Sequence, residues 1–307
     1  MALTRRIPPD RGLTFRMFLT GLFLVVLYAA VIGLLFAVLH NIAVVLVIAA
    51  GFLFVQYWFS DKIALYGMGG RIVTPDQEPE LHGIIDRLCA LADMEKPRVA
   101  VAEVDLPNAF ATGRNPSHAV VCATRGIMRR LDEPELEAVL AHEISHVAHR
   151  DVAVMTIASF LGVVAGLVTR FTLYAGLFGG FGGGDDRSGE NVALVEIAVI
   201  LVSAIIYAVS FLLTMALSRY RELAADRSGA ILIGRPSLLA SALVKVTGEL
   251  SRIPTRDLRA AESFNAFYFA PALSRGASLS TLFSTHPPLE KRLEQLAKLE
   301  AELNQAS

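Results

Sequence analysis

The sequence predicts a mainly α-helical membrane protein with a small β-sheet outside the membrane. Its 307 residues are 54% hydrophobic and its mean hydropathy is +0.51, values above those of an ordinary soluble domain. The apolar surplus lies in four blocks, each long enough to span a bilayer. These blocks are residues 17–39, 42–59, 152–178 and 192–218. We therefore expect four transmembrane helices.

A secretory signal is the alternative for the first block, because Arg5, Arg6, Arg11 and Arg16 precede it. The apolar core of a signal has only about 7 to 15 residues. This block is longer than that, and no small-residue cleavage pattern follows it. We expect an anchor. For the blocks together, the alternative is helices inside a soluble core, but a chain of this length is too small to bury four of them completely.

The distribution of basic residues predicts the orientation. All of the 28 Lys and Arg residues except Arg170 and Arg187 lie on one side of these spans, and the positive-inside rule makes that side the cytoplasm. The formal net charge of -1 gives no indication of a nucleic-acid partner. We divide the chain into an N-terminal arm with a transmembrane hairpin, residues 1–60, and a cytoplasmic region, residues 61–307, through which the third and fourth spans pass.

Cys89 and Cys122 both fall in the predicted cytoplasmic part. We expect free buried thiols rather than a disulfide there. The sequence has no Cys-x-x-Cys pair, so a metal site would need other ligands.

His142 and His146 lie four residues apart, with Glu143 beside the first. Asp132 and Glu135 form a capping-box pattern, and apolar residues then recur at helical spacing, which predicts a helix from about residue 133. Positions four apart share one face of a helix, so both imidazoles can reach one Zn²⁺ while Glu143 points to the open coordination position. The alternative is a helix with two surface histidines and a solvated Glu.

A hydrolytic zinc site needs a third protein ligand. The metzincin solution requires Gly at position 149 and His at position 152, where this chain has His149 and Val152. The other solution is a Glu on a later helix with an Asp four residues further on, and Glu222 with Asp226 fits it. Topology supports this choice. If the helix of His146 continues into the third span, both ligands stand roughly 6 to 9 Å above the same membrane face. The alternative for Glu222 is an exposed side chain between two arginines.

Two further segments are candidates for the site. Asn108, Ala109 and Phe110 lie between the strand-like residues 99–102 and 119–122, which predicts a small sheet whose edge pairs with an extended peptide. His286 precedes an amphipathic C-terminal helix and is a candidate donor to a developing oxyanion. The alternatives are an ordinary loop and core for the tripeptide and a plain helix-start residue for His286.

Taken together, these motifs resemble the HtpX family of membrane zinc metallopeptidases, relatives of the CAAX prenyl proteases. The resemblance extends over nearly the whole chain. It rests on residues 108–113, 142–146 with Arg150 and Asp151, 218–226 and 285–288. It implies a gluzincin-type catalytic region, with His142, His146 and Glu222 as ligands of one Zn²⁺ per chain, Glu143 as the catalytic base and Asp226 as the residue that orients a ligand. It also supports Asn108, Ala109 and Phe110 as substrate contacts and His286 as a site residue.

The resemblance further implies a multi-pass protease of the bacterial inner membrane that cleaves cytoplasmic segments of membrane proteins and unfolded polypeptides, in quality control and the stress response. His149 departs from the family pattern, in which Asn is frequent, and we expect it to pack at the surface. Two alternatives stay open. One is a CAAX-type processing peptidase, for which more spans are expected. The other is a non-enzymatic scaffold that keeps zinc for stability, for which a fourth protein ligand is expected.

Overall fold

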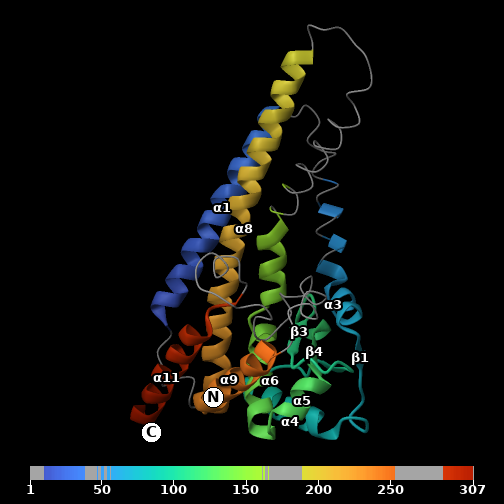
Figure 1. Cartoon of the computed structure of the whole chain (residues 1–307), viewed down its shortest axis with the longest axis vertical. Coiled ribbons are helices and arrows are strands. Elements are labelled where there is room, and N and C mark those ends of the chain that lie inside the picture. The colour runs from blue at the N-terminus through green and yellow to red at the C-terminus, as the bar shows by residue number, and fades with distance from the viewer. Residues whose placement is uncertain are drawn as a thin grey trace.

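The computed structural model shows a helical domain with a small sheet, from which long helices project (Figure 1). It describes residues 10–38, 57–160, 189–252 and 286–306, with the single positions 47, 50, 51, 54, 55, 162 and 165. The elements in chain order are α1 (Arg11–Val38), α3 (Ser60–Met68), β1 (Gly70–Ile72), α4 (Pro79–Ala92), β2 (Arg98–Ala102), β3 (Ala109–Thr112), η1 (Pro116–His118), β4 (Val120–Thr124), α5 (Arg125–Arg130), α6 (Glu133–Ala148), α8 (Gly189–Ile233), α9 (Pro236–Arg252) and α11 (Leu289–Ala306).

Two of these helices are long and apolar enough to cross a membrane over Arg11–Val31 and Ile197–Ile233. In the most apolar 18-residue window of each helix, only 11% and 17% of the residues are buried, so neither window has the burial of a core helix in a soluble protein. α1 and α8 run side by side above the domain (Figure 1). They contain the first and fourth predicted spans. The second and third predicted spans lie mostly outside the described residues, so the prediction of four spans is not confirmed.

α8 connects the membrane part to the domain without a break. Its 45 residues correspond to a length of about 68 Å, roughly twice the thickness of a bilayer's hydrocarbon core. The part of α8 on the N-terminal side of residue 218 exposes apolar side chains. On its C-terminal side, Arg221, Glu222 and Asp226 are buried. The C-terminal part of α8 is therefore a component of the domain core.

The predicted small sheet is confirmed, and it has four strands in the order β1-β2-β4-β3. β2 and β4 are parallel, and the two outer strands are antiparallel to their neighbours. β2 alternates between two cores, as the strand period of two requires. Val99 and Val101 join the main core with α4, α6, α9 and α11, whereas Ala100 and Ala102 join a smaller core against α3. Both faces of the sheet are therefore covered. β3 is the last strand in the order and forms one edge of the sheet.

The capping box predicted for α6 is present. The Asp132 carboxylate accepts from the Glu135 main-chain N–H at 3.0 Å, and the Glu135 carboxylate accepts from the Asp132 N–H at 3.3 Å. The helix ends differently from the expectation. It does not continue into the third span but stops at Ala148, and Arg150 adopts a left-handed φ of 56° before a new helix, Asp151–Phe160, begins. The expectation of one continuous helix was wrong because the sequence pattern of residues 149–151 resembles a helix and contains no Gly or Pro.

Cys89 and Cys122 are free and buried, as predicted. Burial raises the pKa of Cys122 to about 12 and that of Cys89 to about 11, so both thiols are protonated at neutral pH.

Candidate metal centre

The site forms where α6 and α8 cross as antiparallel neighbours. His142 lies opposite Asp226, and His146 lies opposite Glu222 one turn further along both helices. Each helix therefore presents a pair of side chains four residues apart on the face that contacts the other helix. Gly229 allows this close approach, because a Cβ at that position would lie 2.8 Å from the main-chain nitrogen of His142.

His142, His146 and Glu222 form one compact group of metal-binding atoms. Nε2 of His146 lies 3.1 Å from Nε2 of His142 and 3.3 Å from the nearer carboxylate oxygen of Glu222, and Nε2 of His142 lies 3.7 Å from the other oxygen. Ligand atoms around a tetrahedral Zn²⁺, with bonds of about 2.0 to 2.1 Å, are separated by about 3.3 Å. The spacing and the donor types are therefore compatible with zinc. Within the described part of the chain, this group consists of three residues.

Glu143 is adjacent to this group and is only 4% exposed. Its carboxylate accepts a hydrogen bond from the main-chain N–H of Ala111 on β3 and interacts electrostatically with His146 and Glu222. Burial raises the pKa of the Glu143 carboxyl to about 8. Burial also lowers the pKa of His142, which favours the neutral imidazole that a metal requires.

Asp226 contacts the side of His142 that faces away from Glu222. Its Oδ1 lies 2.9 Å from Nδ1 of His142, and it accepts two hydrogen bonds from the Arg292 guanidinium at 2.6 and 2.7 Å. Arg292 is 1% exposed. It is not among the site residues predicted from the sequence, although the sequence contains a signal for it. It lies three residues after Leu289 and four before Leu296, on the apolar face of α11, where a charge needs a buried partner.

Asp151 and Arg221 are two further residues of the site to which the sequence motifs assign no role. Asp151 accepts a hydrogen bond from Nδ1 of His146 at 2.6 Å and is paired with Arg221. Both are buried. Because the sequence predicts no break after α6, it gives no signal that Asp151 turns back toward His146.

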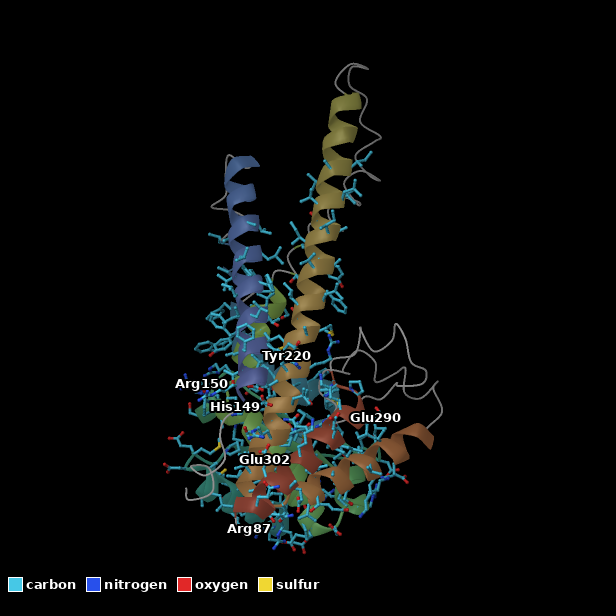
Figure 2. The ribbon with its side chains drawn as sticks, turned by 90° about the vertical axis from the view of Figure 1, so that its left-hand side faces the viewer. Arg87, His149, Arg150, Tyr220, Glu290 and Glu302 are labelled. Atoms are coloured by element: carbon cyan, nitrogen blue, oxygen red, sulfur yellow. The ribbon has the colours of Figure 1, made fainter. Side chains whose placement is uncertain are left out.

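The remaining predicted site residues lie around this centre. His286 is buried, and its Nδ1 donates to Glu222 at 2.8 Å, so it contacts the carboxylate directly. Asn108, Ala109 and Phe110 are buried at the start of β3. His149 lies outside the metal-binding group, at the C-terminus of α6, where its ring is 3.5 Å from the Ser228 hydroxyl. Figure 2 shows His149, Arg150 and Tyr220 where the long helices leave the domain.

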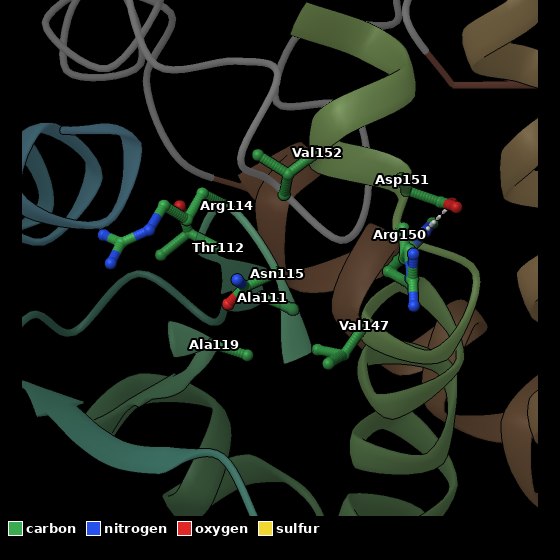
Figure 3. A pocket seen from close by; sticks show the side chains of 11 residues that line it. Ala111, Thr112, Arg114, Asn115, Ala119, Val147, Arg150, Asp151 and Val152 are labelled. Carbon is green, nitrogen blue, oxygen red and sulfur yellow. Dashed lines mark hydrogen bonds and ion pairs between the residues drawn. The ribbon is translucent and has the colours of Figure 1, made fainter. Parts of the chain in front are cut away.

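A pocket adjoins the centre at the end of β3 (Figure 3). Val147 and Ala111 face each other across it. It is lined by residues 111–115 and 119 on one side and by residues 146, 147 and 150–152 on the other. His146 contributes to its wall. The edge strand, the pocket and the metal-binding group are therefore contiguous.

The fold and this site define a metallopeptidase with membrane helices. The model of peptidase family M48 matches residues 75–300. The chain is 57% identical to Protease HtpX homolog 1 of Streptomyces coelicolor, over 98% of this chain and 97% of that one, and 50% identical to a Protease HtpX homolog of Moorella thermoacetica, over 99% of each. The chain therefore belongs to peptidase family M48 and, within it, to the HtpX family.

A solved structure supports the fold independently. The chain aligns with the crystal structure of S. mikatae Ste24p with a TM-score of 0.52 and 16% sequence identity, covering 92% of this chain and 67% of that one. At this identity the likeness concerns the fold alone.

Proposed function

We propose that this chain is a membrane-bound, zinc-dependent endopeptidase in which His142, His146 and Glu222 hold one Zn²⁺. One observation carries the proposal. Two imidazoles from α6 and one carboxylate from α8 bring their ligand atoms within 4.8 Å of one another. Three protein ligands leave one coordination position open, which is the arrangement of catalytic rather than structural zinc. This favours an enzyme over a zinc-stabilised scaffold.

Glu143 is the proposed general base. Zinc, when bound, supplies Lewis-acid polarisation of the scissile carbonyl and of the attacking water. The Glu143 carboxylate takes the proton from that water and returns it to the leaving amine. The N–H of Ala111 fixes the direction of the carboxylate. Asp226 orients His142, and His286, which is buried beside Glu222, is a candidate donor to the oxyanion.

The edge of β3 is the proposed substrate track, with Asn108, Ala109 and Phe110 at its start. The Asn108 carbonyl accepts from the Thr124 N–H on β4 at 2.9 Å. In an antiparallel ladder, successive residues alternate their hydrogen-bonding direction, so Ala109 and Ala111 direct their main-chain groups away from β4. A peptide that adds to this edge would pass Glu143 and continue toward the pocket at the end of β3.

Removing the main-chain donor of Ala109 tests this track. Ala109→Pro deletes its N–H and should reduce the catalytic efficiency of peptide cleavage while the zinc content stays the same. Ala109→Ser keeps the N–H and is the matched control. If the two variants cleave equally well, the substrate lies elsewhere.

The substrates we propose are cytoplasmic segments of inner-membrane proteins and unfolded polypeptides, in membrane-protein quality control. An extended segment is required to add to a strand edge, so a flexible loop or tail next to the bilayer is favoured over a folded domain. We expect tethered reporters to be cut with the cleavable sequence on the cytoplasmic side and not with the same sequence in the periplasm. Cutting confined to the periplasmic placement would contradict the orientation.

Glu143→Gln tests the central assignment. The variant should retain about one zinc per chain and lose casein proteolysis in detergent by several orders of magnitude, because the acceptor for the water proton is gone. Glu133→Gln is the matched control on the same helix, since Glu133 is exposed and distant from the site. Chelation should abolish the wild-type activity and zinc should restore it. Proteolysis close to wild type in Glu143→Gln would rule out the assigned base.

A further inference from the structure

The second histidine of the centre has a buried carboxylate and a buried arginine behind it. His146 donates from Nδ1 to Asp151 at 2.6 Å, and Asp151 is paired with Arg221. Arg221 also donates to the main-chain carbonyl of His149 at 3.1 Å, at the point where α6 ends. Asp151 is 6% exposed and Arg221 is 8% exposed. The pair is thus part of the interior.

His142 also has a buried carboxylate at its Nδ1 and an arginine paired with that carboxylate, but these two groups come from other elements. His142 contacts Asp226 of α8, and Asp226 is held by Arg292 of α11. For His146, the carboxylate comes from the start of helix Asp151–Phe160 and the arginine comes from α8. In both cases the carboxylate contacts Nδ1, and Nε2 lies on the side of Glu222. A carboxylate at Nδ1 fixes the tautomer in which the Nε2 lone pair is available to a metal.

The break after α6 is what brings Asp151 to His146. In a continuous helix each residue advances by about 100°, so a residue five positions further would lie about 140° around the axis, on a different face. The left-handed φ of 56° at Arg150 reverses this course and returns the Asp151 carboxylate to the imidazole. The first residue of the helix that leads toward the membrane therefore belongs to the metal centre.

We propose that Asp151 and Arg221 act as a positioning pair for His146 and raise the affinity of the centre for a divalent metal. The proposal rests on the zinc site of the proposed function. Asp151 sets the tautomer and the direction of the His146 ring. Arg221 holds Asp151 in place, since a buried carboxylate without a cationic partner is strongly disfavoured.

Zinc affinity of the full-length protein in detergent is the measurement. The protein is stripped of metal and titrated with Zn²⁺ in competition with a chromophoric chelator. Asp151→Asn should bind zinc about 10- to 100-fold more weakly, as expected for loss of a group that orients a ligand. Asp151→Glu keeps the charge and should recover part of the affinity. Glu103→Gln, which removes an exposed carboxylate paired with Arg71 and Arg125, should bind like the wild type.

Two further readouts separate positioning from a general loss of structure. The metal-free Asp151→Asn protein should unfold within a few degrees of the wild type, and its Co²⁺ form should show altered visible absorption bands. The double variant Asp151→Asn, Arg221→Gln should lose less affinity than the two single losses combined, because the residues act as a unit. Should Asp151→Asn not fold, Arg221→Lys must weaken zinc binding on its own. Wild-type zinc affinity in Asp151→Asn, or additive losses in the double variant, would overturn the proposal.

The same titration distinguishes this failure from failure of the proposed function. If the wild-type protein binds zinc and His146→Ala removes it, the metal centre stands whatever the effect of Asp151. If His146→Ala binds zinc as tightly as the wild type, the proposed centre itself is wrong, and the positioning pair is wrong with it.

Discussion

α6 and α8 both contribute side chains to the centre but differ in how they are built. α6 has 16 residues, a defined cap at Asp132 and a defined end before Arg150, and almost all of its side chains after the first turn are buried. α8 has 45 residues and no internal boundary between its membrane part and the stretch that carries Glu222 and Asp226. Local sequence therefore sets which residues of α6 face the site. For α8, the residues that face the site are set by the register in which this helix packs against α6.

The largest expected effect comes from removing the contribution of α8. Glu222→Ala should lose zinc affinity outright, because two imidazoles alone hold the metal weakly and His286 and Arg292 would lose the carboxylate they approach. Asp226→Asn removes only a group that orients a ligand and should weaken binding about 10- to 100-fold. Equilibrium zinc titration of both variants measures the difference. Equal zinc affinity in wild type and Glu222→Ala would remove α8 from the ligand set.

An intermediate effect should follow from separating the two helices. Gly229→Ala would place a Cβ 2.8 to 2.9 Å from main-chain atoms of Ala141 and His142, so the helices must move apart, at a cost of about 1 to 3 kcal/mol. Gly83→Ala on α4 is the matched control, because nothing lies within 4 Å of the added methyl group, and it should stabilise the protein by up to about 1 kcal/mol. Thermal unfolding and zinc titration of both variants test whether contact between α6 and α8 sets the register. Unchanged stability of Gly229→Ala would argue against it.

The smallest effect should come from a carboxylate outside both helices. Asp105 is exposed, and hydrogen bonds from Arg130 and Arg129 lower its pKa to about 2. The unfolded pKa is about 3.9, so its contribution to stability is present above about pH 4 and is lost as the pH falls toward 2. Asp105→Asn should lower the thermal midpoint slightly at neutral pH and low salt, and the difference from wild type should shrink with added salt or acid. A large or salt-independent difference would contradict this.

Much of the site was predictable because it depends on helical period. The cap at Asp132, the i and i+4 spacing of the histidines and the matching spacing of Glu222 and Asp226 are properties of consecutive residues. Periodicity also predicted the C-terminal amphipathic helix, and the strand-like residues 99–102 and 119–122 predicted the small sheet beside the site. β1 was missed, since its three residues are too few to show a strand pattern.

The sequence by itself determined the two long apolar helices, the histidine pair on α6, the glutamate beside it and the carboxylate pair on α8. Each follows from composition or from spacing within one element. The tertiary structure decided how the histidines are held. Arg292 reaches Asp226 across 66 residues of chain, and Asp151 returns to His146 only because the backbone breaks at Arg150. Such buried charge pairs depend on the packing of several elements and on one backbone angle, and neither leaves a periodic signal in the sequence.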